Sequence, residues 1–114
     1  MKLIEVNEIN PILTEQLLEV WDKSVRETHL FLSDSEIKNI AKYIPQALNS
    51  IAHLIVAVNG ENKPVAFMGI EERKLEMLFI SHQYRGIGLG KQLLQYGIEN
   101  YFINELGGKN ENTF

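Results

Sequence analysis

The sequence predicts a single α+β domain over residues 1–114, with segments in the order strand, two helices, three strands and a helix. Three observations support this fold class. Short β-branched and apolar runs separated by polar turns follow one another in the middle of the chain, helical apolar spacing lies on either side of them, and 114 residues are enough for one compact domain but not for two. Strands that follow one another directly are typical of an antiparallel sheet with helices packed on it.

The first predicted elements are a short strand and a long helix. Residues 2–6, KLIEV, alternate loosely between polar and apolar side chains, as in a strand with one buried face. Asn10 followed by Pro11 is the expected start of a helix, because asparagine caps free N–H groups and proline fits the first helical position. The apolar residues that follow have helical spacing and should face the core: Leu13, Leu17, Val20, Trp21 and Val25.

Residues 33–50 predict a second helix with an interruption. Ser33 and Glu36 have the spacing of a capping box, in which the serine and glutamate side chains bind each other's backbone N–H groups. Pro45 lacks the N–H group that a continuous helix needs. We therefore expect the helix to kink or to restart there.

Residues 51–80 contain three predicted strands that form an antiparallel meander. IAHLIVAV (51–58) and PVAFMGI (64–70) are joined by the turn sequence NGENK, and EERK leads into LEMLFI (75–80). The last strand should be apolar on both faces, and the pattern after it offers no strand to cover its outer edge. We expect that edge to be covered by a second chain in a homodimer, or by a continuation of the domain in a longer protein.

The final predicted helix begins at Gly88. Its apolar residues form two adjacent stripes, Leu94, Ile98, Phe102 and Leu106 in one and Leu89, Leu93 and Gly97 in the other. The remaining residues, 107–114, resemble a frayed end with no structural signal of their own.

The composition argues against several classes of function. A net charge of -4 is unfavourable for general nucleic-acid binding, and no apolar run approaches the ~18 residues of a membrane span, so neither partner is expected. The absence of cysteine excludes disulfides and thiolate metal sites and fits a cytoplasmic protein. His29, His53 and His82 lack metal-ligand spacing, so no metal is expected.

The segment SHQYRGIGLGKQLL, residues 81–94, carries the strongest functional signal. Three alternate glycines stand between two cations, in the order Arg85, Gly86, Gly88, Gly90 and Lys91. Residues 77–98 contain no aspartate or glutamate, so this part of an acidic chain is locally cationic. A glycine-rich turn at a helix N-terminus exposes backbone N–H groups to a phosphate. The alternative is a tight turn that only allows close packing of helix and strand.

Two familiar phosphate-binding motifs do not fit this segment. A Walker P-loop ending at Gly90 and Lys91 needs a glycine and a hydroxyl where Arg85 and Gln92 stand. A dinucleotide-binding fingerprint needs a glycine where Lys91 or Leu93 stands, and it needs a longer chain after the helix.

A third motif does fit. R-x-x-G-x-G, formed by Arg85, Gly88 and Gly90 after an apolar strand, resembles the acetyl-CoA pyrophosphate loop of the GNAT N-acetyltransferase superfamily. The predicted order of elements is similar to the first two-thirds of that fold. The stretches VWDKSVRETHLFLS, IVAVNGENKPVAFM and LEMLFISHQYRGIGLGK look like the YjaB-like branch of small bacterial acetyltransferases.

The resemblance implies a cofactor and its site. The cofactor is acetyl-CoA, which donates an acetyl group to an amine of a small molecule or a protein. The backbone amides of the loop hold the pyrophosphate, with positive charge added by Arg85, over the residues Gly86, Ile87, Gly88, Leu89, Gly90 and Lys91. The preceding strand holds the pantetheine arm through its main chain at Leu78, Phe79 and Ile80.

The resemblance also suggests residues for catalysis and for the acceptor. Attack of an amine on the thioester needs a base, and Glu76 is the candidate; alternatively, Glu76 forms a surface pair with Lys74 or Arg73. The acceptor side is assigned to residues near the end of the first helix, namely His29, Phe31 and Leu32. Alternatively, His29 is a surface residue at a helix end and Phe31 belongs to the core, as Trp21 is expected to do.

The resemblance covers only part of the family's pattern. The GNAT fold continues after the glycine-loop helix with a strand, a helix and a hairpin, so this chain is expected to be a partial, C-terminally truncated domain. The alternative to an N-acetyltransferase is a non-catalytic acyl-CoA-binding or regulatory module that keeps the pyrophosphate loop. A structural domain whose glycine loop is only a turn is the third possibility.

Overall fold

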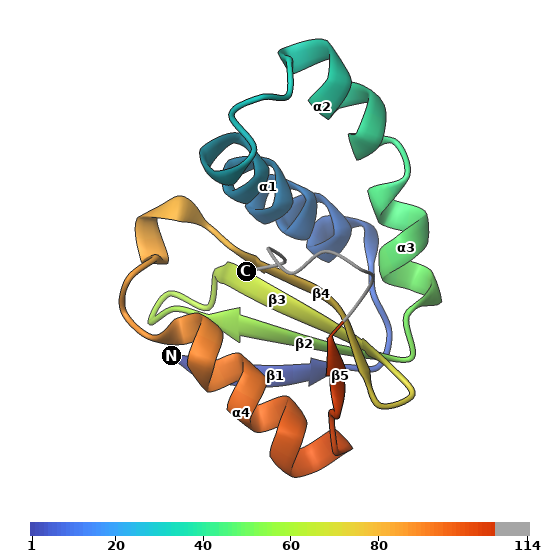
Figure 1. The fold of residues 1–114 in the computed structure, drawn as a ribbon, viewed down its shortest axis with the longest axis vertical. Helices are drawn as coiled ribbons and strands as arrows, with labels where there is room; N and C mark the ends of the chain where they lie inside the picture. The colour runs from blue at the N-terminus through green and yellow to red at the C-terminus, as the bar shows by residue number, and fades with distance from the viewer. Residues whose placement is uncertain (107–114) are drawn as a thin grey trace.

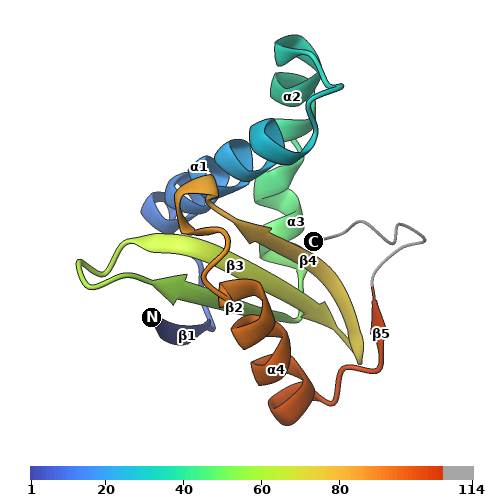
Figure 2. The ribbon, with the colours of Figure 1, turned by 60° about the vertical axis from the view of Figure 1, so that its left-hand side comes forward.

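A five-stranded sheet lies between three α-helices on one face and one on the other (Figures 1 and 2). The computed structural model describes residues 1–106. The elements are, in chain order, β1 (Lys2–Val6), α1 (Pro11–Thr28), α2 (Asp34–Ala41), α3 (Ile44–Ser50), β2 (His53–Val58), β3 (Pro64–Glu71), β4 (Lys74–Ile80), the 3-10 helix η1 (His82–Tyr84), α4 (Leu89–Tyr101) and β5 (Glu105–Leu106). The predicted α+β fold class is confirmed. Within residues 1–106, no helix is both long and apolar enough to cross a membrane.

The helix signals on the α1 side of the sheet are confirmed. The Asn10 side chain accepts a hydrogen bond from the Leu13 N–H at 2.7 Å and caps α1. Ser33 and Glu36 form the capping box of α2, with hydrogen bonds of 2.9 and 3.2 Å. Pro45 restarts the helix, since α2 ends at Ala41 and a new helix, α3, contains the proline in its first turn.

The strands pair in sequence order, and β1 to β4 are antiparallel. The meander predicted for residues 51–80 is confirmed by β2, β3 and β4, and the structure adds β1 beside β2. β4 contains a bulge opposite β3. Gly69 pairs with Met77 and Ile70 pairs with Leu75, so Glu76 has no partner in β3. The extra residue changes the alternation of side chains, and Leu75 and Leu78 consequently contribute to the same core although they are three residues apart.

Each face of the sheet has its own apolar core. On the α1 face, the side chains of Leu17, Trp21 and Val25 pack with Phe67 and alternate residues of β2. On the α4 face, the core contains Ile55, Ala57, Val65, Ala66, Met68, Ile70, Leu75, Leu78, Leu89 and Leu93. Burial on both faces explains why β2 and β3 are continuous apolar runs rather than alternating ones.

The end of the last helix corrects one prediction. α4 stops at Tyr101, and Phe102 adopts a left-handed conformation with φ of 55°. The Phe102 carbonyl accepts a hydrogen bond from Arg73 Nε at 3.1 Å, and the Asn104 N–H donates to the Arg73 carbonyl at 3.0 Å. These contacts with the β3–β4 turn draw the chain away from the helix axis, so the stripe does not reach Leu106 as expected.

The prediction for the outer edge of β4 is also partly wrong. Leu106 lies in β5, a two-residue strand that pairs parallel with Lys74 and Leu75 of β4. The expectation that no strand follows on this edge is therefore wrong at those two residues. A strand of two residues is too short to show an alternating pattern in the sequence, and the pairing of β5 depends on the hydrogen bonds between Arg73 and residues 102 and 104. The tail, which we expect to be frayed, lies outside the described residues.

Candidate functional site

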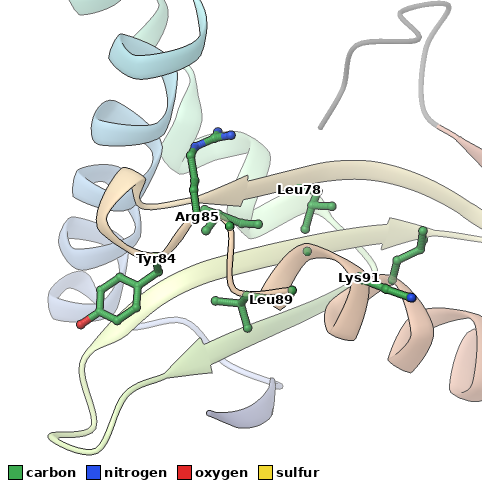
Figure 3. Close-up of a pocket in the computed structure, with 10 residues that line it drawn as sticks. Leu78, Tyr84, Arg85, Leu89 and Lys91 are labelled. Atoms are coloured by element: carbon green, nitrogen blue, oxygen red, sulfur yellow. The ribbon is translucent and has the colours of Figure 1, made fainter.

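A cavity of about 420 Å³ lies between the end of β4, the glycine loop and the first turns of α4 (Figure 3). Its lining is formed by Leu78, Ile80, Tyr84, Arg85, Gly86, Gly88, Leu89, Gly90, Lys91 and Leu94. The cavity therefore brings together most of the residues that the sequence assigns to the cofactor. Its wall combines apolar strand side chains with the backbone of the loop, which is a common composition for a ligand site.

The backbone of the loop is shaped by two glycines. Gly86 has φ of 78° and Gly88 has φ of 82°, both in the left-handed region that other residues enter at a cost. Gly88 is the N-cap of α4 and offers no side chain to cap it. The first N–H group bonded within the helix is that of Gln92, which donates to the Gly88 carbonyl at 3.0 Å. The N–H groups of the first turn are therefore available to a ligand.

Gly90 has a different role from Gly86 and Gly88. A Cβ atom at position 90 would lie 3.1 Å from Cδ1 of Ile80, whereas a Cβ at Gly86 or Gly88 would meet no atom of the described structure within 4 Å. Gly90 thus allows α4 to approach β4. The close approach at Gly90 agrees with a packing role, whereas Gly86 and Gly88 are favoured by their left-handed conformation, and all three line the cavity.

The loop is tied to the rest of the domain at its first two residues. Asn59 in the β2–β3 turn donates a hydrogen bond to the Tyr84 hydroxyl at 3.2 Å. Arg85 Nη2 donates to the Ser24 hydroxyl oxygen on α1, also at 3.2 Å. The strand end is held as well, since the Ser81 N–H donates to the Val65 carbonyl at 2.9 Å.

Positive charge lies on two sides of the loop. Figure 3 shows Arg85 extending from the loop toward α1, while Lys91 projects from the first turn of α4. Within residues 1–106, no carboxylate pairs with either cation, and the first turn of α4 contains no acid. The helix dipole adds a partial positive charge at the same place. The site therefore favours an anion.

The residues of β4 that the sequence assigns to the cofactor point to opposite faces of the sheet. Leu78 and Ile80 line the cavity, but Phe79 points to the opposite face and packs with Phe67, with ring centroids 5.5 Å apart. Ile87 is exposed at the tip of the loop. Phe79 can contribute to this side of the sheet through its main chain only.

Glu76 lies at the bulge of β4 and outside the cavity lining. Lys74 Nζ is 3.4 Å from its carboxylate, and both side chains are more than a third exposed. This is the surface pair that the sequence offers as the alternative to a catalytic base. Glu76 is nevertheless the first residue of β4 beyond the two that pair with β5, so it marks the start of the outer edge that has no strand partner in the described structure.

The three acceptor candidates follow the end of α1. His29 is the C-cap of α1, and its ring stands edge-on to that of Phe31 at 5.7 Å. Phe31 is 80% exposed, so the alternative that it belongs to the core is wrong, whereas Trp21 is 3% exposed and does belong to the core. Leu32 packs against the α1-side core. Phe31 is exposed and His29 is half-buried, and neither ring of this aromatic pair borders the cavity.

Two contributors to the site were not predicted from the sequence. Ser24 and Asn59 contact the loop from α1 and from the β2–β3 turn, at positions 61 and 25 residues away from their partners. The signal for Ser24 was a hydroxyl residue within an otherwise apolar helical stripe, and Asn59 carried only a turn signal. In the described residues, no group of three or more histidine, aspartate or glutamate side chains could hold a metal ion.

The comparison with protein families finds a match over residues 14–111 to the acetyltransferase (GNAT) domain. A curated relative, the peptidyl-lysine N-acetyltransferase YjaB of Salmonella typhimurium, is 34% identical over 84 residues. That alignment covers 74% of this chain and 57% of the relative, so the chain spans little more than half the length of the relative.

Solved structures share the fold. The solution structure of apo YjaB from Escherichia coli superposes with a TM-score of 0.72 and 29% identity, over 87% of this chain and 66% of that one. The PaiA N-acetyltransferase of Thermoplasma acidophilum, solved in complex with coenzyme A, has a TM-score of 0.61 at 20% identity, over 87% of this chain and 71% of that one. The latter likeness concerns the fold alone.

Proposed function

The chain belongs to the GNAT acetyltransferase family, and from this premise we propose that it binds acetyl-CoA at the glycine loop and serves acetyl transfer to an amine. The observation that carries the proposal is the open first turn of α4, with its uncapped N–H groups, next to two cations that no carboxylate neutralises within residues 1–106. This arrangement fits a pyrophosphate, which needs several N–H donors and positive charge.

The loop and the end of β4 are proposed to bind different parts of the cofactor. The N–H groups of Leu89, Gly90 and Lys91 would hold the pyrophosphate, because they precede the first bonded N–H group of the helix and so remain free to donate. Leu78 and Ile80 provide an apolar wall for the arm that follows. When bound, acetyl-CoA supplies a thioester whose acetyl group an amine can attack.

Acetyl transfer forms a C–N bond and breaks the C–S bond of the thioester, so coenzyme A leaves as a thiolate that takes up a proton, and the amine must lose one. An alkylammonium group has a pKa of ~10, so a base must act at neutral pH. We assign this role to Glu76, whose exposed carboxylate lies at the bulge of β4. The acceptor then approaches from the side of His29, Phe31 and Leu32. By analogy with the YjaB relative, the favoured acceptor is the side chain of a lysine in a peptide or protein.

A second candidate function has its own support. Glu76 is outside the cavity lining and is paired with Lys74, whereas the anion site lies wholly within the described residues. An acyl-CoA-binding module without turnover would have these features.

A binding assay followed by a turnover assay separates the possibilities. Coenzyme A and acetyl-CoA should each raise the melting temperature if the loop binds them, because a ligand of the folded state stabilises it. Release of free thiol from acetyl-CoA, with a peptide that contains a single lysine, then tests transfer; the same peptide with Nε-acetyl-lysine is the control. Binding without thiol release would favour the module, and no thermal shift with either compound would refute both functions.

Glu76→Gln tests the assignment of the base. We expect it to lower the rate of thiol release ~100-fold or more, the lower range for loss of a general base, while the affinity for coenzyme A is kept. Lys74→Met is the matched control, since it removes the ion pair but keeps the carboxylate. An unchanged rate in Glu76→Gln would show that the pair with Lys74 is only a surface interaction.

We also propose a homodimer and a cytoplasmic location. The outer edge of β4 from Glu76 to Ile80 has no strand partner within residues 1–106, and pairing with a second copy would satisfy its backbone groups. A monomeric mass in sedimentation equilibrium over a wide concentration range would contradict the dimer. The absence of cysteine agrees with the cytoplasmic location, and the net charge of -4 argues against nucleic acid as a partner.

A further inference from the structure

Ser24 is an unusual residue for its position in α1. It is 2% exposed and lies on the buried face of the helix together with Leu17, Val20, Trp21 and Val25. An apolar side chain would suit this position, because a buried hydroxyl loses free energy unless it is hydrogen-bonded. Ser24 and Ser81 are the only buried polar residues among those described.

The partner of Ser24 is the first residue of the glycine motif. Its hydroxyl oxygen accepts the hydrogen bond from Arg85 Nη2 at 3.2 Å, across 61 residues of sequence. This is the hydrogen bond that the Arg85 side chain makes within residues 1–106. It links the cofactor loop to α1, whose C-terminal end leads into the acceptor candidates His29 and Phe31.

The chemistry of the partner matters for charge. A carboxylate at this position would hold Arg85 more strongly but would neutralise it, as Asp22 and Asp34 do for Arg26 on the same helix. A hydroxyl holds the guanidinium and leaves its positive charge beside the anion site. Four of the five N–H donors of the guanidinium have no partner within residues 1–106.

We propose that Ser24 is a positioning residue, which holds Arg85 against α1 and thereby fixes the conformation of the glycine loop at residues 85–88 while the positive charge is retained. The proposal rests on the proposed function only for its consequence on coenzyme A binding. The contact itself is a property of the unliganded chain. Loss of this hydrogen bond should leave α1 and α4 in place, because the rest of the buried face of α1 is apolar.

The first test measures the loop without any ligand. The N–H groups of Arg85 and Gln92 donate to the carbonyls of His82 and Gly88, so their exchange with solvent reports on the loop. Amide hydrogen exchange of these two residues should be about threefold or more faster in Ser24→Ala and in Arg85→Met than in the unchanged chain, and no faster in the double variant than in either single one, because both changes remove the same hydrogen bond. Thr14→Ala is the matched control. Within the described part of the chain, the hydroxyl that this change removes bonds to the carbonyl of Asn10 and to no other residue, so exchange in the loop should stay unchanged.

The second test measures affinity for coenzyme A by calorimetry. Ser24→Ala should weaken binding about threefold to tenfold in the unchanged background, the range expected for one hydrogen bond, and by less than twofold in the Arg85→Met background. Loop exchange that Ser24→Ala does not accelerate, or equal effects of Ser24→Ala on affinity with and without Arg85, would overturn the positioning role. If the unchanged chain binds no coenzyme A, the proposed function fails, and the exchange measurement alone decides the role of Ser24.

Discussion

Gly88→Ala is the substitution that separates backbone conformation from packing most clearly. Gly88 has φ of 82° and ψ of 11°, and a Cβ atom there would meet no atom of the described structure within 4 Å. The cost to the unliganded chain is therefore conformational only, about 1–2 kcal/mol for an L-residue held in the left-handed region. For 114 residues, each kcal/mol corresponds to about 4 °C, so we expect the melting temperature to fall by about 4–8 °C.

The same substitution should weaken binding of coenzyme A. Gly88 lines the cavity, so an added methyl group occupies space beside the free N–H groups of α4. At a ligand concentration of about 100 times Kd, binding adds about 2.7 kcal/mol, or roughly 11 °C. A tenfold loss of affinity at that concentration leaves about 1.4 kcal/mol, so the thermal shift should fall to about half.

Gly60→Ala is the control for both readouts. Gly60 lies in the β2–β3 turn without a left-handed φ, and a Cβ there also meets no atom within 4 Å. We expect a change within about 0.5 kcal/mol and an unaltered shift with coenzyme A. If Gly88→Ala melts like Gly60→Ala and keeps the full ligand-induced shift, Gly88 neither needs its left-handed conformation nor takes part in binding.

Three further outcomes follow from the fold. Leu93→Ala should lower the free energy of unfolding by about 2–5 kcal/mol in urea titration, since Leu93 is fully buried, whereas the 82% exposed Leu30 should tolerate alanine with a change of about 0.5 kcal/mol or less. The backbone hydrogen bond from Ser33 lowers the pKa of Glu36, so its contribution to stability is present above the ordinary carboxyl pKa and is lost as the pH falls through the lowered pKa. The acid-induced drop in melting temperature should be smaller in Glu36→Gln; an identical drop would contradict the capping role. Burial, assisted by the charge of Glu5, raises the pKa of Tyr96, so ultraviolet titration should reveal a late-ionising phenol that disappears in Tyr96→Phe.

Much of the fold could be predicted because the signals are local. Asn10 and Ser33 cap helices through residues three positions away. Pro45 lacks the N–H group that a helix interior needs, so it fits only the first turn of a new helix. The glycine motif was equally readable, since the conformations of Gly86 and Gly88 are properties of single residues. The hydrophobic spacing then assigned α1 and α4 to the sheet.

The limits of the sequence lie where distant segments meet. The end of α4 depends on hydrogen bonds between Arg73 and residues 102 and 104, and β5 follows from that turn. The bulge that leaves Glu76 unpaired arises from the register of β3 against β4, which no pattern within β4 encodes. Each of these features is stabilised only by contacts with a segment that is distant in the sequence, so no local pattern predicts it.

The α+β fold and a glycine-rich loop at a helix N-terminus could thus be predicted from the sequence alone, because capping, periodicity and glycine conformation act within a few residues. How the loop is held and where its charged side chains point depend on the folded chain. Arg85 turns to Ser24 rather than to the glycines, and Glu76 pairs with Lys74 outside the cavity. Side-chain directions of this kind are set by contacts between elements that are far apart in the chain.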